Sequence, residues 1–109
     1  MLEISSSHLN TSLVVAMKGR IDASSAKELE QQCLSFISAG HQQLIFDFSQ
    51  VDYISSAGLR VVLLIGKQLG ANAGTLKLCA MNEIILNVFE ISGFSKLFTI
   101  YSTVDEASN

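Results

Sequence analysis

The chain has 109 residues, of which 49% are hydrophobic and 16% are charged, and its formal net charge is −3. This length suits a single folded domain spanning residues 1–109, and the low share of charged residues excludes a disordered chain. The negative net charge and the scattered Lys and Arg residues argue against nucleic-acid binding. The high share of hydrophobic residues is compatible with a weak homodimer.

Neither a membrane span nor a leader is visible in the sequence. The longest uninterrupted apolar run, Val61 to Ile65, falls far short of the ~20 residues that a membrane span needs. No basic and apolar leader follows Met1. We therefore expect a cytoplasmic protein without membrane insertion. Cys33 and Cys79 lie in apolar settings without CxxC spacing, which predicts two reduced core thiols.

The first half of the chain predicts a hairpin followed by a helix. Leu2–Ile4 alternates with polar neighbours and is expected to pair with Leu13–Met17 as an antiparallel hairpin. Asp22 then opens a helix whose apolar residues recur every three or four positions. Ser25 and Glu28 have the spacing of a capping box at its start.

The second half predicts alternating strands and helices. Leu44–Phe48 is almost continuously apolar, which is typical of a strand covered on both faces, and Leu59–Leu69 keeps helical spacing. This strand and helix order favours a parallel central sheet. The remaining expected elements are a strand at Thr75–Ala80, a helix capped by Asn82, a strand at Phe98–Tyr101 and a short helix capped by Thr103.

Two adjacent serines stand between the central strand and its helix. We expect Ser56 at or near the N-cap, bonded to the amides of Gly58 or Leu59. Gly58 is interpreted as leaving room for a kinase to reach the Ser56 hydroxyl, and a helix N-terminus favours the charge of a phosphate. Because parallel strands end at one edge of a sheet, Asp47 is expected at the same rim as Ser55 and Ser56.

Catalytic and metal sites are poorly supported. Ser56, His41 and Asp47 could be imagined as a triad, but the sequence has no GxSxG elbow and His41 precedes the strand whose far end carries the serine. His8 and His41 have no Cys or second His near them in the sequence, so a metal site is not indicated. No glycine-rich phosphate loop is present. We expect a protein without enzymatic activity and without a cofactor.

Three segments, in this order and at these separations, point to a known family. They are Gly19-Arg20-Ile21-Asp22, Asp47-Phe48-Ser49 and Tyr53-Ile54-Ser55-Ser56-Ala57-Gly58-Leu59. Together they resemble the STAS domain, named for sulfate transporters and anti-sigma factor antagonists. The resemblance implies an α/β fold with a mixed central sheet of about five strands, in which the first hairpin is antiparallel and parallel βαβ units follow, and with about four helices.

The resemblance also implies a function. In this family an unphosphorylated antagonist binds an anti-sigma factor that is a serine kinase, and so frees a sigma factor. ATP is used by that kinase, and a metal-dependent serine phosphatase reverses the modification. The phosphorylated position corresponds to Ser56, with Ser55 as the second candidate. Ser55 stands where the best-known antagonists have Asp, and Ala57 where Ser or Thr is usual. The expected partner-binding rim comprises Asp22, Asp47, Ser55, Ala57, Gly58, Leu59 and Arg60.

A second class of function remains open at this point. A STAS adaptor that acts by docking alone, beside a transporter or in a stress-signalling assembly, would use Ser56 only as a helix cap. For the antagonist that binds a kinase, the Ser56-to-Val62 face is expected to carry the docking surface. Recovery of transporter or scaffold subunits without a sigma-regulating kinase would favour the adaptor.

Overall fold

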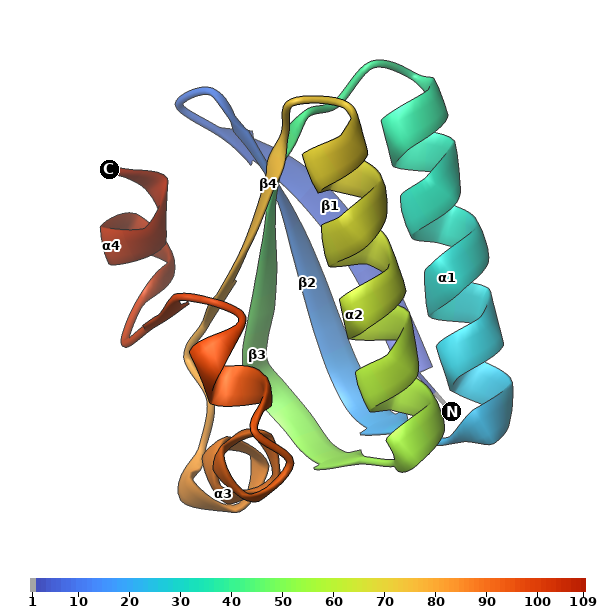
Figure 1. Cartoon of the computed structure of the whole chain (residues 1–109), viewed down its shortest axis with the longest axis vertical. Coiled ribbons are helices and arrows are strands. Elements are labelled where there is room, and N and C mark those ends of the chain that lie inside the picture. The colour runs from blue at the N-terminus through green and yellow to red at the C-terminus, as the bar shows by residue number, and fades with distance from the viewer. Residues whose placement is uncertain (1) are drawn as a thin grey trace.

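One five-stranded sheet, in the order β1-β2-β3-β4-β5, organises the computed structural model, which describes residues 2–109 (Figure 1). β1 is antiparallel to β2, and the other neighbouring strands are parallel. The mixed α/β fold expected from the sequence is thereby confirmed. The elements are β1 (Leu2–Leu9), β2 (Ser12–Ile21), α1 (Ala23–Ser38), β3 (Gln43–Ile54), α2 (Ser56–Ala71), β4 (Thr75–Cys79), α3 (Glu83–Ile91), the 3₁₀ helix η1 (Phe94–Lys96), β5 (Ile100–Tyr101) and α4 (Val104–Ser108).

The parallel strands β2 and β3 end at the same edge of the sheet, and helices α1 and α2 begin there and run back in the opposite direction. β2 and β3 run downward in Figure 1, and α1 and α2 begin at the lower edge where these strands end. We call this edge the carboxyl rim and define it as Arg20–Ser25 together with Tyr53–Arg60. The two segments are tied together by the backbone amide of Ser55, which donates to the carbonyl of Ile21 at 2.8 Å.

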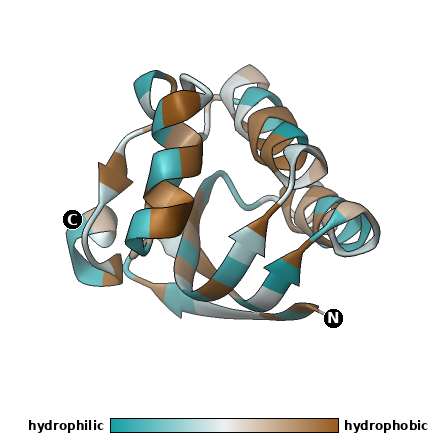
Figure 2. Cartoon of the chain, turned by 90° about the horizontal axis from the view of Figure 1, so that it is seen from below, coloured by the Kyte–Doolittle hydropathy of each residue, from teal (hydrophilic) through white to brown (hydrophobic). Residues whose placement is uncertain are grey.

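The sheet buries its two faces unequally. One face carries the main core, in which Phe46 and Phe48 of β3 pack with residues of α1, α2 and α3. The other face has a smaller cluster that contains Ile45 and Cys79 and is covered by Ala107 of α4. Figure 2, seen from below, shows hydrophobic and hydrophilic residues alternating along the strands, as a period of two requires. The expectation that β3 is covered on both faces therefore holds only for the part near α4.

Several strand lengths differ from the sequence expectation. β1 continues past Ile4 to Leu9, and β2 continues past Met17 to Ile21. β3 continues past the expected end at Phe48 to Ile54, because β2 pairs with it as far as Ile21↔Ile54. β5 contains only Ile100 and Tyr101, which pair with Leu78 and Cys79. Cross-strand pairing, which no local pattern reports, decides these lengths.

The start of α1 uses a different capping box from the one expected. Asp22 is the N-cap, and its carboxylate accepts from the backbone N–H of Ser25 at 3.1 Å. The Ser25 hydroxyl in return accepts from the N–H of Asp22 at 2.9 Å. The predicted pairing of Ser25 with Glu28 is therefore wrong, because Ser25 occupies the third helical position of the box and not its first.

The chain after α3 is held against α2 by an aromatic ring. A Cβ atom on Gly66 would lie 2.6 Å from Cε1 of Phe98, so the glycine admits the ring. The two thiols are buried as expected, and burial raises the pKa of both Cys33 and Cys79 to about 12. Within residues 2–109, no helix has both the length and the apolar character needed to cross a membrane.

Candidate functional site

Ser55 caps helix α2. Its backbone is extended, with φ −88° and ψ 173°, and its side-chain oxygen accepts from the N–H of Gly58 at 3.2 Å. Its own N–H completes the last backbone bond to β2 at Ile21. Ser55 is thus the N-cap by both geometry and hydrogen bonding. The expectation that Ser56 performs this capping role is wrong.

Ser56 is left free by this arrangement. It is the first residue of α2 and is exposed to solvent. Among the hydrogen bonds formed within residues 2–109, none involves its hydroxyl. The first turn of a helix presents unpaired backbone N–H groups and a partial positive charge. A free hydroxyl in that position can receive a phosphoryl group without breaking an existing interaction.

Gly58 has a packing role and does not form part of the accessible surface. The residue is buried, and a Cβ atom built on it would lie 2.7 Å from Cγ2 of Ile21 and 2.7 Å from Cγ1 of Ile54. The interpretation that this glycine leaves room for a partner is therefore wrong. Two isoleucines at the ends of β2 and β3 already fill the space beside this residue. Because Gly58 has no side chain, the first turn of α2 can lie directly on them.

The other rim residues on α2 differ in exposure. Ala57 and Leu59 are half-buried and pack against the main core, whereas Arg60 is exposed. Residues one turn apart lie on the same face of a helix, so Arg60 follows Ser56 on the solvent side. Of the α2 residues expected at the partner-binding rim, Arg60 is the exposed one, so its side chain is available to a partner.

Asp22 is held at the same rim by hydrogen bonds within its own turn. Its carboxylate accepts from the N–H and hydroxyl of Ser25 and from the hydroxyl of Ser24. These bonds, led by the backbone N–H of Ser25, lower the pKa of Asp22 below its ordinary value. A lowered pKa means that the ionised cap stabilises α1 above the pKa of the unfolded chain. This contribution is lost as the pH falls through the folded value.

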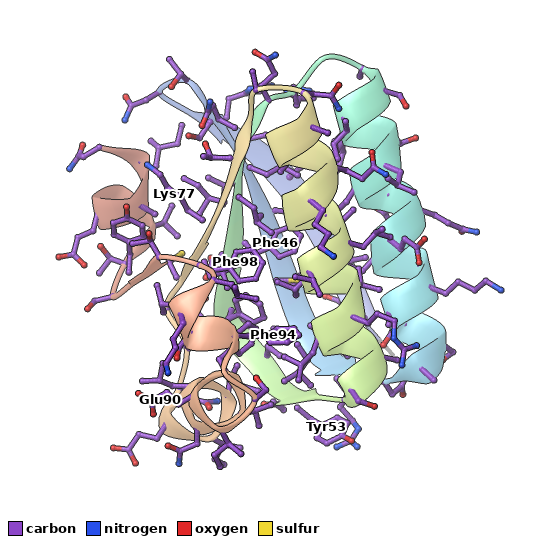
Figure 3. The ribbon with its side chains drawn as sticks, in the orientation of Figure 1. Phe46, Tyr53, Lys77, Glu90, Phe94 and Phe98 are labelled. Carbon is purple, nitrogen blue, oxygen red and sulfur yellow. The ribbon has the colours of Figure 1, made fainter. Side chains whose placement is uncertain are left out.

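An arginine and tyrosine pair at the rim was not anticipated. The guanidinium carbon of Arg20 lies 4.3 Å from the centroid of the Tyr53 ring, and both side chains are exposed. Figure 3 shows Tyr53 just below the first turn of α2. The two residues are directly paired across β2 and β3. Both residues belong to the segments that resemble the STAS domain, so the sequence marked each of them separately. Only the register between β2 and β3 shows that they lie side by side.

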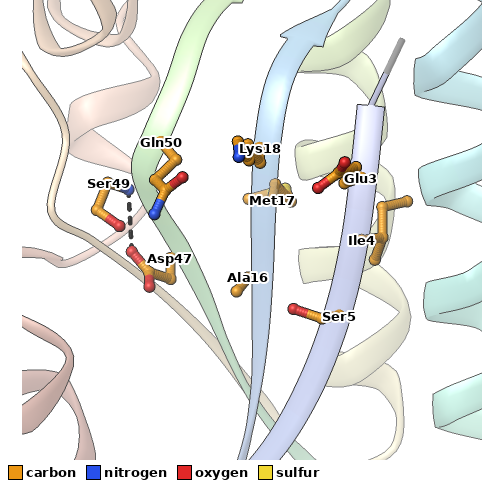
Figure 4. A pocket seen from close by; sticks show the side chains of 9 residues that line it. All are labelled: Glu3, Ile4, Ser5, Ala16, Met17, Lys18, Asp47, Ser49 and Gln50. Atoms are coloured by element: carbon orange, nitrogen blue, oxygen red, sulfur yellow. Dashed lines mark hydrogen bonds between the residues drawn. The ribbon is translucent and has the colours of Figure 1, made fainter.

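Asp47 lies away from the rim, and its predicted place there is wrong. It pairs with Ala16 and Cys79 inside the sheet, and β3 continues beyond it to Ile54. Its carboxylate accepts from the N–H of Ser49 at 2.9 Å. Figure 4 shows it in a shallow, polar hollow over β1, β2 and β3, on the face opposite α1 and α2. Asp47 and Ser56 therefore cannot act on one substrate group together.

The histidines do not join the serine either. His41 lies in the loop before β3, and Ser56 follows the other end of that strand. The structure instead brings His41 within 5.5 Å of His8, measured between ring centroids, a proximity that the sequence separation concealed. Within residues 2–109, no group of three or more His, Cys, Asp or Glu side chains could hold a metal ion.

Substitution of Ser55 by alanine should destabilise the protein more than substitution of Ser56. We expect Ser55→Ala to lower the free energy of unfolding by about 1 kcal/mol, because it leaves the Gly58 N–H without its acceptor. Ser55→Asp should retain the cap, since a carboxylate accepts the same bond and suits the helix dipole. Ser56→Ala should change stability by less than about 0.5 kcal/mol. Urea denaturation of the three variants measures the difference, and an equal loss for both alanine variants would contradict the assignment.

Comparisons with known proteins agree with this fold. The STAS domain family matches residues 3–107, and the chain belongs to this family. It is 38% identical over 96 residues to a Bordetella bronchiseptica protein that carries the name anti-sigma factor antagonist BtrV, covering 88% of this chain and 83% of that protein. An anti-sigma factor antagonist from Mycobacterium paratuberculosis has a similar structure, with a TM-score of 0.89, 25% identity and coverage of 98% of this chain and 91% of that one. The Bacillus cell fate determinant SpoIIAA, solved in its phosphorylated form, has a TM-score of 0.75 at 21% identity, with 96% of each chain covered.

Proposed function

We propose that this protein is a cytoplasmic anti-sigma factor antagonist. In its unphosphorylated form it binds an anti-sigma factor that is also a serine kinase, and the bound kinase releases its sigma factor. Phosphorylation at Ser56, with ATP as the phosphoryl donor, switches the antagonist off. A metal-dependent serine phosphatase returns it to the binding form. The protein itself acts as a binding module and not as an enzyme.

The observation that carries this proposal is that the two adjacent serines have different roles: one caps α2 and the other is exposed to solvent. Ser55 holds the helix, with its oxygen engaged by the N–H of Gly58, while the Ser56 hydroxyl is exposed and has no hydrogen-bond partner among residues 2–109. A phosphorylation switch needs an acceptor whose modification leaves the fold intact. Ser56 meets this requirement, because the residue that holds the first turn of α2 is a different one.

The electrostatics of α2 favour the modified state of the folded protein. A phosphate adds about −1.5 to −2 charges at neutral pH, and a helix N-terminus stabilises such charge by about 0.3–1 kcal/mol. We therefore expect the phosphorylated domain to remain folded. What changes is the surface offered to the partner, since a hundredfold loss of affinity requires only about 2.7 kcal/mol. A charge of this size at the contact is sufficient.

The relatives support the same function. The Bordetella protein named as an anti-sigma factor antagonist aligns with most of this chain at 38% identity. A Mycobacterium tuberculosis relative named anti-sigma-F factor antagonist RsfB is 24% identical over 94 residues. The replacement of the usual Asp by Ser55 is compatible with the function, because Ser and Asp are about equally good N-cap residues.

Capture of the partner tests the proposal. Tagged protein is purified from its own cells, and its bound proteins are identified by mass spectrometry. We expect an anti-sigma factor, which is then purified with its sigma factor. Adding unphosphorylated antagonist to this pair should release the sigma factor in size-exclusion chromatography. Recovery of transporter or scaffold subunits, with no sigma-regulating kinase, would replace the proposal by a phosphorylation-independent adaptor role.

A further inference from the structure

A groove between α1 and α2 opens beside Ser56. Both helices begin at the carboxyl rim and lie side by side along the sheet (Figure 1). The groove has a volume of about 390 Å³. Its apolar lining comes from Ala26 on α1 and from Ala57, Val61 and Leu64 on α2. The small alanine side chains leave space between the helices that a side chain of another protein can fill.

The charged residues of this groove are mainly basic. Lys27 and Arg60 line it with exposed side chains, and Glu30 is the one acidic residue among those that line it. Two cations and one carboxylate give a local charge of about +1, although the whole chain carries −3. Arg20, the other basic residue at the rim, is stacked on Tyr53. An apolar lining bordered by cations fits an apolar side chain that is followed or preceded by a carboxylate.

We propose that this groove receives an acidic segment of the anti-sigma factor, in which an aliphatic or aromatic side chain lies next to an Asp or Glu. The inference rests on the proposed function and specifies the chemistry of the partner at that site. The apolar side chain packs against Val61 and Leu64, and the carboxylate pairs with Arg60 and Lys27.

Arg60 also connects the groove to the phosphorylation site. With 100° of rotation per residue, Arg60 lies about 40° around α2 from Ser56 and between that serine and the groove-lining Ala57 and Leu64. A phosphate on Ser56 is one helical turn from the Arg60 guanidinium and competes with the partner's carboxylate for it. The same phosphate repels that carboxylate directly. Arg60 therefore couples phosphorylation to release of the partner.

Charge-reversal variants of the full chain test the groove. Binding to the purified anti-sigma factor is measured by titration calorimetry at low and physiological salt. We expect Arg60→Glu and Lys27→Glu each to weaken binding roughly tenfold and to reduce its salt dependence. Lys96→Glu, the matched control, makes the same charge change on η1 and should bind as the unmodified protein does. Unchanged circular dichroism spectra and thermal midpoints exclude misfolding.

A second measurement tests whether Arg60 links phosphorylation of Ser56 to the loss of partner binding. Phosphoserine is introduced at position 56 during translation, and affinity is compared with and without it. In the Arg60→Gln variant we expect the loss of affinity on phosphorylation to be about three- to tenfold smaller than in the original chain. Equal affinity of Arg60→Glu, Lys27→Glu and the original chain would overturn the groove assignment while leaving the proposed function intact. No binding of the original chain to the anti-sigma factor would overturn both.

Discussion

Ser56→Ala should take up no phosphate from the cognate anti-sigma factor kinase and ATP, whereas the original chain should gain one phosphoryl group. The exposed hydroxyl of Ser56 forms no hydrogen bond within the described part of the chain, and the oxygen of Ser55 accepts from the N–H of Gly58 at the N-cap. Intact-protein mass spectrometry measures the gain. Phosphorylation of the original chain should weaken kinase binding by about a hundredfold, equivalent to about 2.7 kcal/mol.

Ser55→Asp is the matched control for this experiment. It removes the second candidate hydroxyl but keeps an acceptor for the first turn of α2. We expect it to be phosphorylated as fully as the original chain. Full modification of Ser56→Ala together with none of Ser55→Asp would move the phosphorylation site to Ser55 and would contradict the assignment.

Gly58→Ala should lower the free energy of unfolding by about 1–3 kcal/mol. The added Cβ would lie 2.7 Å from side-chain atoms of Ile21 and of Ile54. Both isoleucines are buried and stiff at χ1, so they cannot move aside easily. For a domain of this size the change corresponds to a fall of several degrees in the thermal midpoint. Differential scanning calorimetry measures it.

Gly70→Ala, in the same helix, is the control. Apart from its chain neighbours and the backbone of its own helix, no atom of residues 2–109 lies within 4 Å of a Cβ atom at that position, so the alanine adds only its helix propensity. We expect it to stabilise the protein by about 0.5–1 kcal/mol. If Gly58→Ala were equally stabilising and only weakened partner binding, the glycine would serve partner access after all, and its packing role would be refuted.

The sequence by itself determined the order and type of the elements. Alternation in Leu2–Ile4, together with the short polar gap before the apolar strand Leu13–Met17, indicated the hairpin. The three- and four-residue spacing in Leu59–Leu69 indicated α2. Caps at Asn82 and Thr103 were also predicted, and each side chain accepts the expected bond, from Ile85 and Glu106 respectively. These features depend on hydrogen bonds and side chains within a few residues of one another, so a local pattern is enough to predict them.

The tertiary structure alone decided which serine caps α2 and which residues share the rim. Ser55 is the cap because its N–H closes the last bond between β3 and β2, at Ile21, so the chain stays extended through Ser55. The same pairing lengthens β3 and leaves Asp47 inside the sheet. It also fills the space beside Gly58. Cross-strand register joins residues more than thirty positions apart, and short-range periodicity carries no information about it.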